Sequence, residues 1–273
     1  MLSERAADDA RAVGHLATEA LLQVRATGRR LAALPRGEAP TTSAAAHAIQ
    51  DLVAGQLGPV VGWKVGAASL TAEPFRAPLH AATVWTEGER LPAGLLHRIG
   101  VEAEIIHRLG KDLPPRERPY TRGEVLAAVA TMHPAIEIID SRFVDLAAVD
   151  ALSQRADQQN HGALVVGPAL SDWAGLDPVR QPVRLTIQDV VRAEAVGGNS
   201  AVDPVRLLVW LANDGARPLG GLRAGQVVTT GSCTGTIFVD PGARIVADFP
   251  GLGRVALEIA RTPSRNHSWE TLR

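Results

Sequence analysis

Two carboxylates stand two residues apart in an apolar run, Gly100-Val101-Glu102-Ala103-Glu104-Ile105-Ile106. Side chains alternate along a β-strand, so Glu102 and Glu104 would share one face while their apolar neighbours share the other. A helix would point the two carboxylates apart, and the β-branched neighbours also favour a strand. Two like charges this close raise each other's pKa unless a cation lies between them. The run therefore predicts a strand with one apolar and one acidic face, and a divalent metal ion on the acidic one.

A third carboxylate lies in the middle of a second apolar run, Pro134-Ala135-Ile136-Glu137-Ile138-Ile139-Asp140-Ser141-Arg142. A lone buried carboxylate is costly, so Glu137 needs a partner or an ion. Together Glu102, Glu104 and Glu137 offer oxygen ligands without Cys or His, which suits a hard cation, Mg²⁺ or Mn²⁺. From spacing alone there is an alternative, in which the first two glutamates lie on the solvent face of an antiparallel strand and Glu137 pairs with Arg142.

Further segments extend the pattern along the chain. They are Gly62-Trp63-Lys64-Val65-Gly66-Ala67-Ala68-Ser69, His47-Ala48-Ile49-Gln50, Ala156-Asp157 leading to Val165-Val166-Gly167, and Leu222-Arg223-Ala224-Gly225-Gln226-Val227-Val228-Thr229-Thr230-Gly231-Ser232. With the two acidic runs, they resemble the 2-keto-4-pentenoate hydratase branch of the fumarylacetoacetate hydrolase superfamily, which also contains 4-oxalocrotonate decarboxylases. The resemblance covers nearly the whole chain and favours the metal site over the alternative. It implies an α+β fold with a mixed, mostly antiparallel β-rich body, helices at its entry and edges, and a homo-oligomer.

The composition excludes several classes of partner. Among 273 residues, 28 Lys and Arg nearly balance 29 Asp and Glu, so no overall field favours nucleic acid or an acidic membrane. No apolar run is long enough to span a bilayer, and the first residues are charged, unlike a signal peptide. The single Cys233 excludes an internal disulfide. We therefore expect a cytoplasmic protein whose partner is a small metabolite.

The chain is expected to form one body with a helical entry. A helical pattern from Ser3 to about Leu34, and a second helix ending near residue 56, form an N-terminal segment, 1–60, packed on a catalytic body, 61–261, with a polar tail at 262–273. Thr121-Arg122-Gly123-Glu124 indicates a capping box that opens a helix through about Met132. The later pattern predicts a helix at about 203–213 and strands at 183–191, 226–230, 236–239, 244–249 and 253–259.

The resemblance also implies which side chains carry the chemistry. Lys64 matches a lysine near substrate and metal, where its ammonium would offset the carboxylates and steer a proton; a lysine in a strand is otherwise often a solvated edge residue. The chain departs from the hydratases at Ala82, where an active-site acid is usual. His80 or His161 could supply an acid or base near neutral pH, and His161 is the second catalytic candidate. Either histidine could instead be a solvated loop residue.

Polar side chains in three loops are candidates for binding substrate. Backbone amides and hydroxyls of the run 229–232 could grip a carboxylate. The family usually has Asp-Asn-x-Ser where this chain has Asp157-Gln158-Gln159-Asn160, a second departure. As an alternative, Asp157 and Asn160 only stabilise a turn. The substrate-binding candidates are Ser69, Asp157, Asn160, Thr230 and Ser232.

The family mechanism implies a function for this set. Glu102, Glu104 and Glu137 would hold Mg²⁺ or Mn²⁺, which chelates a 2-oxo acid and stabilises its enolate. We therefore expect a hydro-lyase of the 2-keto-4-pentenoate hydratase type, acting in aromatic catabolism on a 2-hydroxy-2,4-dienoate or a related 2-oxo acid. Ala82 and Asn160 leave alternatives open: a 4-oxalocrotonate-type decarboxylase, an acylpyruvate C–C hydrolase, or a repurposed or non-catalytic relative that binds a metabolite or a protein.

Overall fold

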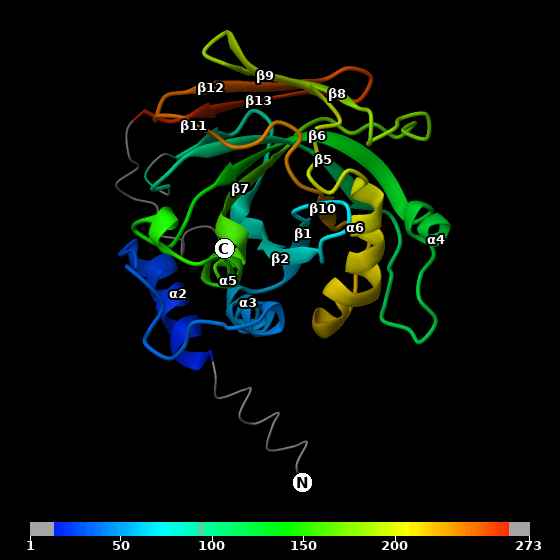
Figure 1. The fold of residues 1–273 in the computed structure, drawn as a ribbon. Coiled ribbons are helices and arrows are strands. Elements are labelled where there is room, and N and C mark those ends of the chain that lie inside the picture. Colours follow the sequence, from blue (N-terminus) through cyan, green and yellow to red (C-terminus); the bar gives the residue numbers. More distant parts are fainter. Residues whose placement is uncertain (1–13, 93, 95, 262–273) are drawn as a thin grey trace.

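A large sheet forms the centre of the computed structural model, which describes residues 14–92, 94 and 96–261 (Figure 1). The strand order of this eight-stranded sheet is β2-β1-β10-β5-β6-β7-β3, with β11 paired to β5. Most neighbours are antiparallel, and β1–β10 and β3–β7 are parallel. Its strands are β1 (Val60–Gly66), β2 (Phe75–His80), β3 (Val84–Thr86), β5 (Gly100–Leu109), β6 (Val129–Ile139), β7 (His161–Val166), β10 (Val227–Thr229) and β11 (Ile237–Phe238).

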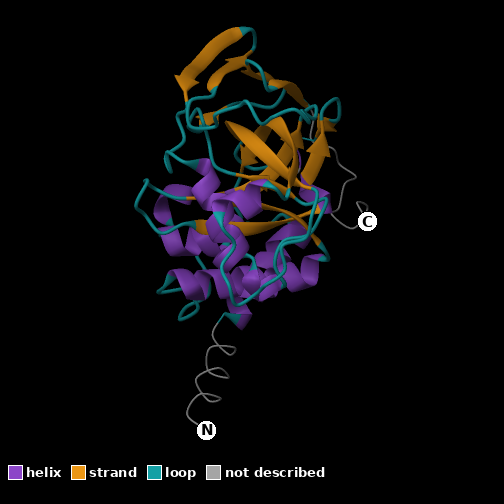
Figure 2. Ribbon diagram, turned by 90° about the vertical axis from the view of Figure 1, so that its right-hand side faces the viewer, coloured by secondary structure: helices purple, strands orange, loops and turns teal. Residues whose placement is uncertain are grey.

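A five-stranded sheet lies against one face of the larger sheet, with the order β4-β13-β12-β8-β9 (Figures 1 and 2). Its strands are β4 (Arg90–Leu91), β8 (Pro182–Ile187), β9 (Val190–Val196), β12 (Arg244–Phe249) and β13 (Gly253–Ile259). The single strand expected at 183–191 is wrong, because β8 and β9 form a hairpin. Gln188 and Asp189 take φ values of 51° and 63°, and two consecutive left-handed residues make a tight hairpin turn.

Helices lie at the entry and edges of the sheets, as expected for an α+β fold (Figure 2). They are α2 (His15–Thr27), α3 (Ser43–Leu57), α4 (Arg122–Leu126), α5 (Ala151–Ala156) and α6 (Pro204–Trp210). The expected helix to Leu34 is wrong, since Gly28 takes φ 71° and caps α2 directly after Thr27. The start of that helix and the tail at 262–273 lie outside the described residues. None of the described helices has the length and apolar character to cross a membrane.

The predicted capping box is confirmed, but the helix after it is shorter than expected. The Thr121 hydroxyl accepts from the Glu124 backbone N–H, and the Glu124 carboxylate accepts from the Thr121 N–H. The helix ends at Leu126, and β6 begins at Val129, so the expected helix through Met132 is wrong. Pairing with β5 along almost the full length of β6 overrides the helix propensity of this segment.

The main core fills the space between the two sheets. Val101, Ala103 and Ile105 of β5 point into it, together with apolar side chains of β12 and β13. The other face of β5 carries the acids and, further along, Ile106. Ile106 belongs to a smaller apolar cluster with Leu79, Ala135, Leu164, Val166 and Val227. The acidic positions therefore lie beside this apolar cluster, on the face of the large sheet that points away from the main core (the inner face).

Candidate metal and substrate site

Strands β5 and β6 bring the three predicted carboxylates together. Glu102 lies directly opposite Glu137 in the antiparallel register, and Glu104 follows on the same face of β5. One carboxylate oxygen from each lies within 4.8 Å of the others. Glu104 and Glu137 are buried, and Glu102 is half-buried. The predicted strand is confirmed, and the alternative pairing of Glu137 with Arg142 is wrong, because Arg142 binds another carboxylate.

Burial of the three acids changes their proton affinities. Burial, followed by the charge of Glu137, raises the pKa of Glu102. The same two causes, with the charge of Glu102 added, raise the pKa of Glu104 well above its ordinary value. Burial would also raise the pKa of Glu137, but the Lys64 ammonium and His161 outweigh it and lower that pKa to about 2. Glu137 is thus ionised, whereas Glu102 and Glu104 resist ionisation. A bound cation would lower the pKa of both and favour their ionised forms.

Lys64 and His161 both contact the ionised Glu137. Lys64 Nζ lies 2.7 Å from Glu137 Oε1 and donates to the Gln159 carbonyl at 3.1 Å. His161 Nδ1 lies 2.9 Å from the same carboxylate oxygen, and its Nε2 lies 3.0 Å from the Thr83 hydroxyl. Burial lowers the pKa of His161, so the ring is neutral with one N–H. A carboxylate only accepts, so Nδ1 carries that hydrogen and Nε2 is the acceptor nitrogen beside the Thr83 hydroxyl. The His80 carbonyl, 3.1 Å from the same hydroxyl, is a second acceptor for its one hydrogen.

Hydroxyl groups from β10 and the following loop complete the acid cluster. Sequence reasoning assigned the run 229–232 to substrate and missed its contact with the acids. The Thr229 hydroxyl donates to Glu104, and the Gly231 N–H donates to the same carboxylate at 3.1 Å. The Thr236 hydroxyl donates to Glu102. The alternation of side chains along β10 is a signal that could have selected Thr229 over its neighbour. The position of β10 beside β5 is set by topology, which the sequence pattern does not reveal.

Three of the proposed substrate-binding hydroxyls have other contacts. Thr230 is buried, and its hydroxyl donates to a β5 backbone carbonyl at 3.4 Å. The Ser232 hydroxyl accepts from a backbone N–H two residues further on, at 3.2 Å. Ser69 is exposed, and its hydroxyl accepts from the backbone N–H three residues later, at 3.1 Å. None of these hydrogen bonds reaches the acids, and the three residues stay predictions as substrate contacts.

Asp157 and Asn160 occupy different positions in the loop before β7. The Asp157 carboxylate is fully buried and accepts from Arg142 Nε at 2.5 Å and from the Arg142 N–H at 2.8 Å. This ion pair occupies the guanidinium that could have bound a second substrate carboxylate. Asn160 Nδ2 donates to Gln154 at 3.0 Å, whereas its Oδ1 is buried with no partner among the described residues. The Asp157 carboxylate thus binds the distant segment 141–142 and not its own turn, and Asp157 stays a prediction as a substrate contact. Asn160 keeps one acceptor that has no partner among the described residues.

The turn that carries Ala82 presents a hydroxyl in place of the expected acid. Ala82 lies in the 3₁₀ turn Ala81–Thr83, and Thr83 contacts His161. His80, just before the turn, has Nδ1 at 3.2 Å from the Pro59 carbonyl. Burial lowers the pKa of His80 to about 4, so this ring is also neutral near pH 7. Of the two histidines, His161 is the one in hydrogen-bond contact with the acids.

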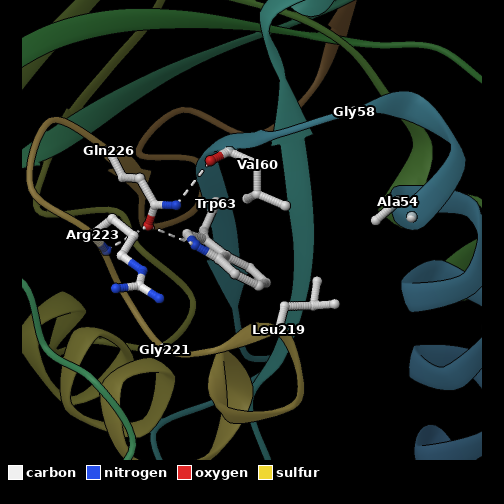
Figure 3. A pocket seen from close by; sticks show the side chains of 9 residues that line it. Ala54, Gly58, Val60, Trp63, Leu219, Gly221, Arg223 and Gln226 are labelled. Carbon is white, nitrogen blue, oxygen red and sulfur yellow. Dashed lines mark hydrogen bonds between the residues drawn. The ribbon is translucent and has the colours of Figure 1, made fainter.

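A cavity of about 290 Å³ lies on the opposite face of β1 (Figure 3). Trp63 lines it, and the indole Nε1 donates to Gln226 Oε1 at 3.2 Å. Lys64 is the next residue along β1, so its side chain points to the other face of the sheet. The lining residues are Ala54, Gly55, Gly58, Val60, Trp63, Leu219, Gly221, Arg223 and Gln226. None of the three acids is among them, so this cavity is separate from the acid site.

Comparison with known proteins relates this arrangement to a family. Residues 65–260 match the family described as fumarylacetoacetate (FAA) hydrolase C-terminal. The chain is 32% identical over 208 residues to the 2-keto-4-pentenoate hydratase of Paraburkholderia xenovorans (strain LB400), covering 73% of this chain and 76% of that protein. It is 31% identical over 160 residues to a 4-oxalocrotonate decarboxylase of Pseudomonas sp, covering 57% and 59% of the two chains.

A solved structure shares the fold. It is the 4-oxalocrotonate decarboxylase from Pseudomonas putida G7 complexed with magnesium and adipate, with a TM-score of 0.78 and 23% identity over 89% of this chain and 95% of that one. The family match covers most of the chain, and the relatives come from one branch. The chain therefore belongs to the fumarylacetoacetate hydrolase superfamily, in the branch of the 2-keto-4-pentenoate hydratases and 4-oxalocrotonate decarboxylases.

Proposed function

We propose that the protein is a divalent-metal-dependent lyase of the 2-keto-4-pentenoate hydratase type, acting on a 2-hydroxy-2,4-dienoate or a related 2-oxo acid. The observation that carries this proposal is the group of buried Glu104 and Glu137 and half-buried Glu102, with Lys64 beside it. Charged groups are costly to bury, so a scaffold without activity has no reason to keep four of them together. Hydratase relatives at 32% and 29% identity support the reaction type. A cytoplasmic location and a homo-oligomer stay predictions of the family resemblance.

The residues present fit a hard divalent cation. The donors are carboxylate oxygens alone, which Mg²⁺ and Mn²⁺ prefer. Glu137 Oε2 is buried without a hydrogen-bond partner among the described residues, so a cation would supply the partner that it lacks. Magnesium in one structure of the similar decarboxylase and calcium in another support a divalent cation. When bound by Glu102, Glu104 and Glu137, the ion would polarise the 2-oxo carbonyl and stabilise negative charge there.

Lys64 is in place to act on an anionic substrate oxygen. An ammonium has three donors, and Glu137 and the Gln159 carbonyl take two of them. Burial would lower the pKa of Lys64, but the charges of the three acids outweigh burial and raise it, so the ammonium stays protonated. The third N–H can donate a hydrogen bond to an anionic oxygen of the substrate or transfer a proton to the substrate there.

His161 is in place to handle the second proton. Glu137 holds the Nδ1–H, which fixes the tautomer and leaves the Nε2 lone pair beside Thr83. In this role His161 replaces the acid that the hydratases carry where this chain has Ala82. Thr83 would orient the ring, since its hydroxyl is the partner of Nε2.

A specific observation favours decarboxylation of a 4-oxalocrotonate-type acid as the second candidate. Addition of water needs a base to activate it, and Ala82 removes the usual acid-base group. Loss of CO₂ needs mainly stabilisation of the charge left behind, which the retained acids and Lys64 support. A decarboxylase is also among the relatives, at 31% identity. Hydrolysis of an acylpyruvate requires activated water too, so Ala82 counts against it.

Product analysis by NMR separates these reactions. The protein with Mg²⁺ would be incubated separately with 2-hydroxypenta-2,4-dienoate, 4-oxalocrotonate and an acylpyruvate, each with a chelator control. We expect chelator-sensitive formation of 4-hydroxy-2-oxopentanoate from the dienoate. Loss of CO₂ from 4-oxalocrotonate would select the decarboxylase, and cleavage to pyruvate would select the hydrolase. No turnover of any of the three with Mg²⁺ or Mn²⁺ would refute the proposal and favour a non-catalytic relative.

A further inference from the structure

Three consecutive non-glycine residues between α5 and β7 have left-handed backbones. Gln158, Gln159 and Asn160 take φ values of 47°, 53° and 57°. This conformation is disfavoured for residues with a Cβ, and a run of three persists only where the surroundings hold it. The run also determines where β7 begins with His161. Contacts with the surrounding protein must therefore stabilise this strained segment, which lies directly beside the candidate site.

Arg25 of α2 holds the first residue of this run. Arg25 Nη2 donates to Gln158 Oε1 at 2.6 Å, and Gln158 Nε2 donates to the Pro78 carbonyl at 3.1 Å. Gln158 is 3% exposed, and the Arg25 side chain is 11% exposed. A charged donor makes one of the stronger protein hydrogen bonds. The Gln158 amide is therefore fixed from two sides, by the N-terminal segment and by β2.

The helix that carries Arg25 is itself firmly placed. Ala17 and Leu21 of α2 are fully buried in a cluster with Ile49 of α3 and Phe143. At the end of α2 the Gly28 N–H donates to the Val24 carbonyl at 2.7 Å and caps the helix, three residues after Arg25. The guanidinium thus extends from a packed helix, so its hydrogen bond can hold the strained run in one position.

The middle residue of the run faces the acid site. The Gln159 carbonyl accepts from Lys64 Nζ at 3.1 Å, and the same ammonium lies 2.7 Å from Glu137. The direction of this carbonyl depends on the backbone angles of Gln158 and Gln159. If Gln158 were released, the carbonyl could turn away, and Lys64 would keep Glu137 as its remaining fixed partner.

We infer that Arg25 is a positioning residue for Lys64: through Gln158 it fixes the left-handed run and aims the Gln159 carbonyl at the lysine ammonium. Through Arg25, the N-terminal segment then helps to position a residue of the site, in addition to packing on the catalytic body. The positional part of this inference stands on the contacts alone. Its consequence for turnover rests on the proposed lyase function.

Four variants test the link in the full-length protein. Arg25→Met and Gln158→Met each break it from one side, and the double variant closes a mutant cycle. Arg29→Met is the matched control, since Arg29 is an exposed arginine just beyond α2. Amide hydrogen exchange of the segment 157–162, read by mass spectrometry, reports the run without any substrate. Melting curves with and without Mg²⁺, and kcat and KM on the substrate found by product analysis, complete the set.

We expect exchange of the segment to become roughly tenfold faster in each single variant, the effect of losing one charge-assisted hydrogen bond. The double variant should show less than the sum of the two single effects, because both substitutions remove the Arg25–Gln158 hydrogen bond. It need not match a single variant, since Arg25 also lies 3.7 Å from Asp157 and Gln158 also donates to the Pro78 carbonyl. kcat should fall with KM and the Mg²⁺-induced rise in Tm retained, and Arg29→Met should match the wild type.

Three outcomes would overturn the inference. They are unchanged exchange in Arg25→Met, additive effects in the double variant, and faster exchange with unchanged kcat in a protein that is active. The first two need no turnover, so they decide the positional link even if the lyase proposal fails.

Discussion

The two faces of β5 bury polar side chains in opposite ways. Glu104 on the inner face is 1% exposed, and it accepts hydrogen bonds from Thr229 and Gly231. His107 on the core face is also 1% exposed, yet neither ring nitrogen has a partner among the described residues. Burial alone lowers the pKa of His107 to about 4, so the ring is a neutral group in the core. The two side chains are therefore equally buried but differ in their hydrogen bonds. Glu104 belongs to a hydrogen-bonded site, whereas His107 has no hydrogen-bond partner among the described residues.

Removing an acid from the inner face should give the largest effect. In Glu102→Ala we expect turnover to fall at least ~10³-fold, because a metal ion contributes several kcal/mol of charge stabilisation in such reactions. Mg²⁺ should raise the Tm of the wild type, since an ion that binds only the folded state stabilises it, but not that of the variant. Glu258→Ala on β13 is the control, an exposed acid paired with Arg90. Equal Mg²⁺ responses in the wild type and Glu102→Ala would contradict the metal site.

Replacing His161 should lower turnover while leaving the acids able to bind metal. A positioned acid or base contributes ~10²-fold or more to rate, so His161→Ala should lose about that factor in kcat. The Mg²⁺-induced rise in Tm should remain, because Lys64 still contacts Glu137. Thr83→Val should give a smaller loss that Thr83→Ser does not, since serine keeps the hydroxyl beside Nε2. Unchanged kcat in His161→Ala would make His161 a structural residue.

Removing a hydroxyl that supports the acids should weaken metal binding without abolishing it. Groups that orient metal ligands typically contribute 10- to 100-fold to affinity, so Thr229→Val should weaken Mg²⁺ binding by about tenfold. Thr230→Val is a matched control, because the next hydroxyl along donates to a backbone carbonyl and not to an acid. Calorimetric titration with Mg²⁺ compares the two. Equal affinities for both variants would show that the hydroxyl on Glu104 has no role in the site.

The sequence was sufficient for the parts of the site that depend on local pattern. The alternation around Glu102 and Glu104 predicts both the strand and its two faces, because a period of two has one structural meaning. Glu137 follows by the same reasoning, since a carboxylate in an apolar run needs a partner. In the structure, one carboxylate oxygen of each of the three acids lies within 4.8 Å of the others. Glu137 also contacts Lys64 and His161.

The contacts that the sequence did not reveal join distant segments. Thr83 reaches His161, and Thr229 reaches Glu104, through strand neighbours that follow from topology and leave no periodic signal. The left-handed residues at 158–160 and 188–189 have side chains that do not demand that conformation. Tertiary contacts also outweighed local preference at Val129, where β6 begins inside an expected helix.

Substituting the core-face histidine should change stability alone. His107→Leu removes two unpaired ring nitrogens, so the variant should be more stable by about 1–3 kcal/mol near pH 7.5, where the ring is neutral. Urea unfolding curves measure the difference. Turnover and Mg²⁺ binding should match the wild type, because His107 faces away from the acids.

The pH dependence of the same pair sharpens the comparison of the two faces. The pKa of His107 is about 4 when folded against 6.5 for the free side chain, so below pH 6.5 the unfolded chain takes up a proton that the folded protein does not. Wild-type stability therefore falls as the pH drops from 6.5 towards 4, and His107→Leu escapes this component. At pH 5 the gap between the two proteins should be about 2 kcal/mol wider than at pH 7.5. His47 and His80, whose pKa values burial also lowers, remain in both proteins and cancel in the difference. A gap independent of pH would mean that His107 has a partner in solution, and the contrast between the two faces of β5 would then be one of packing alone.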